Sequence, residues 1–229
     1  MINHPVTDIF FDLDHTLWDF ERNSELTYRK VFDLHGIDLD LQAFLAIYVP
    51  ANLRFWKLYR DGKITKQALR RRRLQEVFGQ MGIRVDTATV DRLADAYIEH
   101  LSTHTHLVPY TREILDYLGG RYRLHIITNG FEEVQHRKLH NSGIAAYFKE
   151  VVNSERAGVK KPHPAIFKLA LRLAGSQAGS CVMIGDNLEA DILGARAVGL
   201  QTLHYNAHND PLHENGPVIS HLSEIKSYL

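Results

Sequence analysis

The sequence predicts an α/β protein whose parallel sheet is covered by helices on both faces and carries an inserted all-helical cap. A buried strand pattern occupies residues 6–11, only helical periodicity follows to about residue 101, and strand and helix patterns alternate after Pro109. Strands that alternate with helices form parallel sheets with both faces covered. We therefore expect a core formed by residues 1–18 and 105–229 and a cap formed by residues 19–104.

The first strand consists mainly of β-branched and aromatic residues and ends at two acids, Asp12 and Asp14. Residues two apart on an extended chain point the same way, so these two carboxylates are expected to share a site. Neighbouring carboxylates are unfavourable unless a cation or an acid/base role accommodates them. The strand therefore leads into a candidate reaction site.

The cap contains four expected helices, at residues 23–35, 41–59, 65–81 and from residue 86 or 87 to about 101. Thr65 is expected to cap the third helix, and Gly82 to close it. Pro50 lies inside the second, which we expect to be bent or interrupted there. No strand pattern occurs in this block.

The rest of the core alternates between the two patterns. Strands are expected at residues 124–128, 150–153, 181–184 and 202–205. Helices are expected at residues 111–118, 131–141, 163–174 and 189–198, and over the last nine residues. Because parallel sheets place their sites at the carboxyl ends of the strands, the residues after each strand are the functional candidates.

Composition excludes several other classes. The 27 basic and 27 acidic residues give a formal net charge of zero, which argues against nucleic acid or a membrane surface as a partner. No apolar run reaches the length of a membrane span and no signal peptide is evident, so we expect a cytoplasmic protein, as a monomer or small homo-oligomer. The single cysteine, Cys181, cannot form an internal disulfide. The four arginines at residues 70–73 fit a solvated helix face.

Polar residues of related chemistry follow every main strand of the core. They are Asp12, Asp14 and Thr16; Thr128 and Asn129; Lys161; and Asp186 with Asp191. A carboxylate can attack phosphorus, and a second carboxyl can protonate the leaving oxygen and later activate water. Carboxylate oxygens suit Mg²⁺, while a hydroxyl and a lysine can hold phosphate oxygens. The set therefore suits phosphoryl transfer to water.

These motifs, in this order, resemble the haloacid dehalogenase superfamily of phosphohydrolases, whose fold is a Rossmann-like core with a helical cap. The resemblance implies that Asp12 is the nucleophile and Asp14 the general acid/base. It implies Mg²⁺ as the cofactor, bound by the Asp12 side chain, the Asp14 carbonyl and Asp186, with Asp191 acting nearby through a water. The phosphate would be bound by Thr128, Asn129 and Lys161. His15 stands where many members have glycine.

A closer resemblance is to the pyrimidine 5′-nucleotidases of that superfamily. It rests on residues 127–131, on the cap run from residue 52 to residue 65, and on residues 205–208. It implies a small phosphate ester, a pyrimidine nucleoside monophosphate, as substrate. The residues that we expect to contact the rest of that substrate are Trp18, Asn52, Arg54, Trp56 and Phe131, since aromatics stack on bases and amide or guanidinium groups bind their edges.

Alternatives remain open at this point. A sugar-phosphate or phosphoglycolate phosphatase would share the core motifs. Dehalogenation is disfavoured because dehalogenases lack the second acid, which is present here as Asp14. Phosphonate cleavage needs a distinguished cap lysine, and none stands out. A non-catalytic binding module on the same fold is the remote alternative, and the aromatics could instead pack the cap.

Overall fold

The computed structural model describes residues 2, 3 and 5–229, and the chain forms two compact units. The first consists of Met1–Phe20 and Thr105–Leu229 and contains the sheet. The second, Glu21–His104, is helical. Each unit is described separately below.

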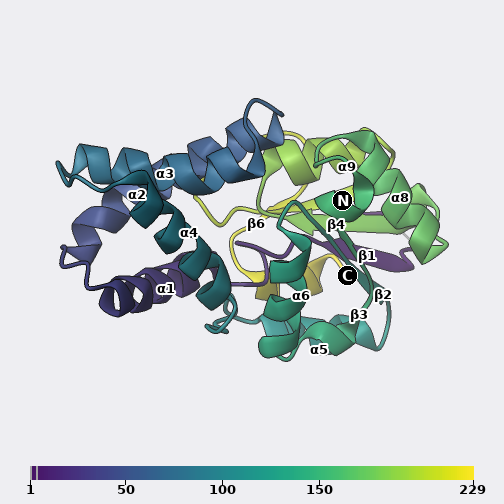
Figure 1. Ribbon diagram of the computed structural model, residues 1–229. Helices are drawn as coiled ribbons and strands as arrows, with labels where there is room; N and C mark the ends of the chain where they lie inside the picture. The colour runs from purple at the N-terminus through teal and green to yellow at the C-terminus, as the bar shows by residue number, and fades with distance from the viewer. Residues whose placement is uncertain (1, 4) are drawn as a thin grey trace. The chain divides into compact units, whose positions relative to one another are not determined.

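The first unit is built on a six-stranded sheet in which every neighbouring pair is parallel, in the order β3-β2-β1-β4-β5-β6 (Figure 1). The strands are β1 (Asp8–Phe11), β2 (Arg123–Thr128), β3 (Phe148–Asn153), β4 (Cys181–Gly185), β5 (Gln201–Tyr205) and β6 (Val218–Ile219). This arrangement confirms the predicted α/β class. The sequence pattern did not predict β6, a two-residue edge strand.

Helices cover both faces of the sheet. Helices α5 (Thr111–Gly119) and α6 (Glu132–Asn141) lie on one face, and α8 (Pro164–Ala174) and α9 (Gly194–Arg196) lie on the other (Figure 1). The connections also contain a short helix α7 (Ser154–Ala157) and the 3₁₀ turns η1 (Ala145–Tyr147) and η2 (Ala178–Ser180). The expected closing helix is the 3₁₀ segment η4 (Leu222–Ser227), and the expected helix at residues 189–198 is a π-helical turn, η3 (Leu188–Leu193), followed by α9.

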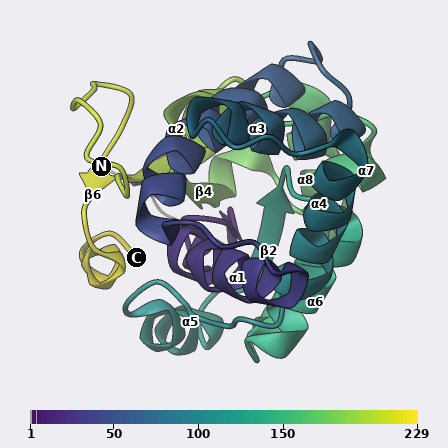
Figure 2. The ribbon, with the colours of Figure 1, turned by 60° about the vertical axis from the view of Figure 1, so that its left-hand side comes forward.

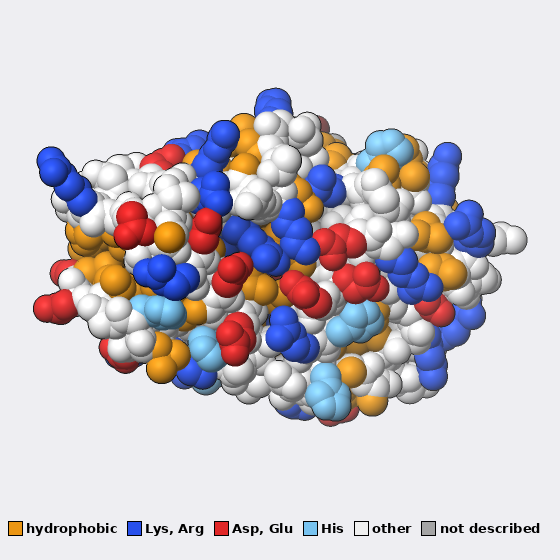
Figure 3. Space-filling view, viewed as in Figure 1, with side chains coloured by type: hydrophobic (Ala, Val, Ile, Leu, Met, Phe, Trp, Pro, Cys, Tyr) orange, Lys and Arg blue, Asp and Glu red, His pale blue; other side chains and the backbone are white. Residues whose placement is uncertain are grey.

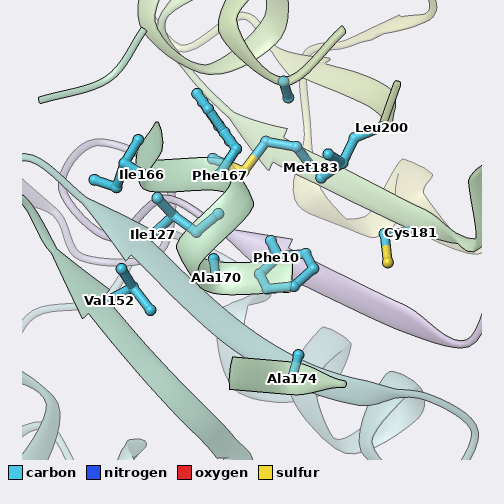
Figure 4. Close-up of a cluster of buried hydrophobic side chains, with 11 residues drawn as sticks. Phe10, Ile127, Val152, Ile166, Phe167, Ala170, Ala174, Cys181, Met183 and Leu200 are labelled. Carbon is cyan, nitrogen blue, oxygen red and sulfur yellow. The ribbon is translucent and has the colours of Figure 1, made fainter. Parts of the chain in front are cut away.

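The face beneath α8 forms a continuous hydrophobic core (Figure 4). Phe10 and Met183 are register partners on β1 and β4, and both are fully buried. Phe167 and Ala170 contribute from α8. Burial on both faces explains why the strands read as nearly continuous apolar runs, and it fixes the strand ends that carry the polar residues.

The second unit contains α2 (Leu41–Arg60), α3 (Lys66–Gln80), α4 (Thr87–Leu101) and nearly all of α1 (Phe20–His35), and α3 packs beside both α2 and α4 (Figure 2). Thr65 caps α3, as predicted, and Asp86 caps α4, whose start was expected at residue 86 or 87. Helix α2 continues through Pro50 rather than being interrupted there. Pro50 lies on the exposed side of α2, where water can satisfy the carbonyl that lacks its usual donor.

Charges of both signs are interspersed on the surface shown in Figure 3, in keeping with the zero net charge. This face therefore does not present a strong electrostatic potential of a single sign. Across residues 2, 3 and 5–229, no helix is long and apolar enough to cross a membrane.

Candidate active site

Asp12 lies at the point where the sheet changes winding direction. The chain moves from β1 outward to β2 and β3, then returns to β4 on the other side of β1. Ligands of open parallel sheets bind at this point, beyond the carboxyl ends of the strands. Asp12 follows β1 directly, and its N–H donates to Ile184 O on β4 at 2.9 Å.

The loop after Asp12 is compact. The N–H groups of Leu17 and Trp18 both donate to Leu13 O, at 3.0 and 2.9 Å. His15 has φ of 64°, in the left-handed region that favours glycine. The loop therefore keeps its shape with histidine at the position where many members of the resembled superfamily have glycine.

Lys161 connects two of the acids. Its buried ammonium donates to Asp12 Oδ1 at 2.6 Å and to Ile127 O at 2.7 Å, and it lies 2.6 Å from Asp191 Oδ1. Burial opposes the charge on Lys161, but Asp12 and Asp191 raise its pKa above the usual value. The ammonium is therefore a fixed positive charge beside Asp12.

Asp186 forms the other side of the site. Its Oδ1 accepts from Thr16 Oγ1 at 3.1 Å, and its Oδ2 lies 3.3 Å from His208 Nε2. His204 Nε2 contacts the Asp186 carbonyl at 2.8 Å. Burial favours the protonated form, but His208 and the charge of His15 outweigh it and lower the pKa of Asp186.

The carboxylates of Asp12, Asp186 and Asp191 each offer an oxygen within 4.8 Å of the other two, and all three residues are buried. Burial and the negative neighbours Asp191 and Asp186 raise the pKa of Asp12 well above its ordinary range, although Lys161 opposes the shift. Burial and Asp186 also raise the pKa of Asp191. Three carboxylates that share a buried site are unfavourable without a cation, and their oxygens fit a divalent cation with oxygen ligands.

A π-helical turn presents Asp191 to the site. Asp191 lies on η3, and its Oδ2 accepts from Asn187 N at 3.0 Å. π-helical turns are rare and occur frequently at functional sites. The sequence pattern predicted an ordinary helix here because periodicity over so few residues cannot distinguish the two.

The side chain of Asp14 points to α6 instead of into the carboxylate cluster. Lys138 Nζ donates to Asp14 Oδ1 at 2.5 Å, and Gln135 Nε2 donates to Asp14 Oδ2 at 2.9 Å. This geometry leaves the Asp14 backbone carbonyl, rather than its side chain, as the predicted metal ligand. The carboxyl itself is one-fifth exposed, and its role as the general acid/base stays a prediction.

Sequence reasoning missed Lys138 and Gln135. Positions 131, 134, 135, 138 and 139 form the buried stripe of α6, with the i, i+3, i+4, i+7, i+8 spacing of a core-facing helix side. A lysine and a glutamine in such a stripe are unusual, because lysine is almost never fully buried unless paired. That signal was present in the sequence.

Thr128 is the last residue of β2 and Asn129 follows it, and the two have different surroundings. Thr128 Oγ1 accepts from Gly130 N at 3.1 Å and from Gln135 Nε2 at 2.7 Å. Both ends of the Asn129 amide bind the backbone of Lys161: Oδ1 accepts from its N–H at 2.7 Å and Nδ2 donates to its carbonyl at 3.1 Å. The Asn129 side chain thus fixes Lys161, while phosphate binding by Thr128 and Asn129 stays a prediction.

The expected substrate-contacting residues of this unit are both buried. Trp18 lies under Lys138, whose Nζ is 4.2 Å from the centre of the indole. Phe131 is the N-cap residue of α6. Contact of Trp18 and Phe131 with a substrate stays a prediction. Trp18 also packs against the Lys138 ammonium.

In the helical unit, the three expected residues do not share one face of α2. Asn52 is buried and accepts from Arg73 Nη1 at 2.8 Å and Tyr48 Oη at 3.3 Å. Arg54 is exposed and pairs with Glu76 on α3. Residues two apart on a helix point to nearly opposite sides, so Asn52 and Arg54 face different surroundings, and contact of these residues with a substrate stays a prediction.

Comparison with known proteins supports the chemistry of this site. The model of the haloacid dehalogenase-like hydrolases matches residues 9–199. Pyrimidine 5′-nucleotidase PynA of Streptococcus pneumoniae is 34% identical over 88% of this chain and 84% of its own, and pyrimidine 5′-nucleotidase YjjG of Escherichia coli is 33% identical over 88% and 86%. A glyceraldehyde 3-phosphate phosphatase of Pyrococcus abyssi is 32% identical over 86% and 80%.

A solved structure extends the comparison to the whole chain. The magnesium-bound HAD-hydrolase YfnB of Bacillus subtilis superposes with a TM-score of 0.88 and 27% identity, covering 99% of both chains. The matching family model spans more than half of this sequence, and the three relatives above are named as two pyrimidine 5′-nucleotidases and a glyceraldehyde 3-phosphate phosphatase. The chain belongs to the haloacid dehalogenase-like hydrolase family and is a phosphatase.

Proposed function

We propose that this phosphatase is a Mg²⁺-dependent 5′-nucleotidase that hydrolyses pyrimidine nucleoside monophosphates through an aspartyl-phosphate on Asp12. The observation that supports the chemistry most strongly is the placement of Asp12. It lies at the switch point of the sheet, with Lys161 Nζ 2.6 Å from its Oδ1 and two further carboxylates within ligand distance. A carboxylate in this position can be both nucleophile and cation ligand.

In the proposed first step, the carboxylate of Asp12 attacks phosphorus and the bond from phosphorus to the ester oxygen breaks. Asp14 gives its proton to that leaving oxygen, so the product departs as an alcohol. In the second step, Asp14 takes a proton from a water that attacks the phosphorus, and the bond from phosphorus to Asp12 breaks. Asp12 is then regenerated, and Asp14 again carries its proton.

The surrounding residues bind the transferred group. The Lys161 ammonium and the Thr128 hydroxyl would contact phosphoryl oxygens, whose charge is redistributed in the transition state. Asp12, Asp186 and the Asp14 carbonyl would hold Mg²⁺, with Asp191 next to it. When bound, the ion would supply positive charge that favours the ionised form of Asp12 and neutralises the phosphate. The magnesium-bound structure of YfnB supports this ion as the cofactor.

Two observations support a nucleotide as substrate: the names of the relatives PynA and YjjG, and the similarity to them over most of the chain. A sugar phosphatase is the second candidate, because the Pyrococcus abyssi relative acts on glyceraldehyde 3-phosphate at a comparable identity. The catalytic groups bind only the phosphate, so they do not separate the two candidates. Dehalogenation does not fit, because it has no leaving oxygen for Asp14 to protonate.

The test compares kcat/KM for phosphate release from dUMP and dTMP with that for dAMP, glyceraldehyde 3-phosphate and phosphoglycolate, in Mg²⁺. We expect at least about tenfold preference for the pyrimidine nucleotides, the discrimination that a difference of 1.4 kcal/mol in transition-state binding gives. A preference for a sugar phosphate or phosphoglycolate would overturn the nucleotidase proposal. Absence of phosphate release from every ester would overturn the hydrolytic mechanism as well.

A further inference from the structure

Two side chains of one helix take up both oxygens of the Asp14 carboxylate. Lys138 Nζ donates to Oδ1 at 2.5 Å, and Gln135 Nε2 donates to Oδ2 at 2.9 Å. These residues are one turn apart on α6, so they face the same side of it. Asp14 belongs to the loop after β1, where an isolated β-bridge to Trp18 involves its backbone, and the contacts to α6 hold its carboxyl group.

Lys138 occupies an unusual environment. Its side chain is 3% exposed, and its ammonium lies 4.2 Å from the centre of the Trp18 ring and 5.3 Å from that of Phe20. Among the residues that the structure describes, Asp14 is the one carboxylate that forms an ion pair with it. Burying a lysine is unfavourable unless it is paired, so this arrangement indicates a specific role for the Lys138–Asp14 contact.

Gln135 connects the same carboxylate to the phosphate-binding hydroxyl. Its Nε2 donates to Asp14 Oδ2 and also to Thr128 Oγ1, at 2.7 Å. Gly130 makes room for this bridge, because a Cβ at that position would lie 2.2 Å from Gln135 Nε2. The backbone after β2 is therefore shaped around the side chain that reaches Asp14.

We propose that Lys138 is a positioning residue for the general acid/base: it holds Asp14 Oδ1 so that Oδ2 carries the proton that is exchanged with the substrate. An ammonium only donates hydrogen bonds, so Oδ1 must remain an acceptor. Oδ2 can accept from Gln135 with one lone pair and carry the proton on the other. This inference rests on the proposed function, since it assigns how the acid of that reaction is oriented.

The inference makes a prediction that depends on the leaving group. Departure of an alkoxide needs the proton of Asp14, whereas p-nitrophenolate is a stable anion and leaves without one. The value of kcat/KM reports the steps up to the first irreversible one, here phosphoryl transfer to Asp12 with loss of the leaving group. A misplaced Asp14 should therefore lower kcat/KM for an alkyl ester much more than for an aryl ester.

The experiment measures kcat/KM for dUMP and for p-nitrophenyl phosphate with Mg²⁺, in the wild type, Lys138→Met and Lys138→Arg. Methionine keeps the length of the side chain over Trp18 but removes the donor. Arg137→Met is the matched control, because Arg137 is the exposed neighbour on the same helix. Competitive inhibition by inorganic phosphate shows whether the phosphate site is intact, and Lys138→Gln provides a second variant in case the methionine protein does not fold.

For Lys138→Met we expect a loss of about 10- to 100-fold with dUMP, part of the 10²–10⁴-fold that general acid–base catalysis contributes. The loss with p-nitrophenyl phosphate should be under about threefold, inhibition by phosphate should be unchanged, and Lys138→Arg should recover most of the dUMP activity. Arg137→Met should match the wild type.

Equal losses with the two substrates, or full dUMP activity in Lys138→Met, would overturn the positioning role and leave the phosphatase mechanism standing. A wild-type protein that hydrolyses neither ester would instead overturn the proposed function, and this inference with it. The two failures are therefore distinguishable in one experiment.

Discussion

Gly185 leaves the space that the carboxylate of Asp191 occupies. A Cβ built on Gly185 would lie 2.3 Å from Asp191 Oδ2, closer than atoms can approach without a shift. Gly185 is the last residue of β4, and Asp191 lies on the π-helical turn that follows. The glycine is therefore required by the close approach of a side chain and not by backbone conformation.

We expect Gly185→Ala to displace Asp191 and disturb Lys161, which contacts it. Turnover should fall at least about tenfold, and the free energy of unfolding should fall by about 1–3 kcal/mol, the usual effect of overpacking. Steady-state kinetics and denaturant unfolding measure the two effects. Gly119→Ala is the control, because its Cβ would meet Tyr147 at an ordinary 3.8 Å. Wild-type turnover in Gly185→Ala would show that the position of Asp191 does not matter.

Mg²⁺ should both activate and stabilise the protein. An ion that binds only the native state adds about 2.7 kcal/mol to the free energy of unfolding when its concentration is 100 times the dissociation constant. The unfolding midpoint rises as a result. We expect the midpoint to rise with Mg²⁺ in the wild type and to rise much less in Asp186→Asn, and turnover to stop in excess EDTA. Equal midpoint shifts in both proteins would argue that the ion binds elsewhere, and full turnover of metal-free protein in EDTA would refute the metal requirement.

Asp12→Asn should abolish turnover and leave the fold intact. Removing the covalent nucleophile commonly costs on the order of 10³-fold or more in rate. Lys161 would keep its contacts with Ile127 O and Asp191, so the site should not collapse. Circular dichroism provides the check on folding. A folded variant with near wild-type phosphate release would mean that another group attacks phosphorus.

Acid should weaken the sheet unit through a buried pair of β1 and β2, Asp8 and His125. Asp8 is fully buried and accepts from Thr7 Oγ1 at 2.7 Å and from Arg123 Nη2 at 2.8 Å, and it contacts His125 Nε2 at 2.9 Å. Burial alone would raise the pKa of Asp8, but these hydrogen bonds outweigh it and lower the pKa. Burial lowers the pKa of His125 despite Asp8.

Both shifts act in the same direction on stability. A carboxyl with a lowered pKa stabilises the fold above its unfolded pKa, and this contribution is lost as the pH falls through the folded pKa. When the pKa of a histidine is lower in the folded state, its contribution to the free energy of unfolding also decreases as the pH falls below about 6.5. Unfolding free energy should therefore decrease steadily with acid.

We expect Asp8→Asn to lose about 2 kcal/mol at pH 7, as for a buried charged hydrogen-bond partner, and to show a shallower acid limb. Urea unfolding at several pH values measures this, with the exposed Asp210→Asn as control. An acid limb of unchanged slope in Asp8→Asn would exclude Asp8 as its source.

The sequence predicted the main strands and the acids at their ends because burial on both faces gives continuous apolar runs that stop abruptly at Asp12, Thr128 and Gly185. It did not predict β6, because two residues of edge strand carry no periodic signal. In the helical unit, the start of α3 was predicted from its capping side chain, Thr65, and the start of α4 was expected at its capping residue, Asp86, or at residue 87.

The site was predictable in its acids and less so in the groups that orient them. The sequence analysis did not single out Lys138, whose partner, Asp14, is 124 residues away in sequence. Asn52 and Arg54 were named together because of motif similarity. The helix period alone would have placed them on different faces of α2. Sequence proximity is a poor guide to shared contact on a helix, where direction changes by about 100° per residue.

The nucleophilic role of Asp12 is tested most directly by trapping the phosphoenzyme in Asp14→Asn with p-nitrophenyl phosphate. This substrate needs no proton to release its leaving group, whereas hydrolysis of the aspartyl-phosphate needs Asp14 as base. The account predicts one equivalent of nitrophenolate in a rapid burst and, by mass spectrometry of the digested protein, one phosphoryl group on the peptide that contains Asp12. A burst without phosphorylated protein, or a phosphoryl group on a peptide that lacks Asp12, would contradict it.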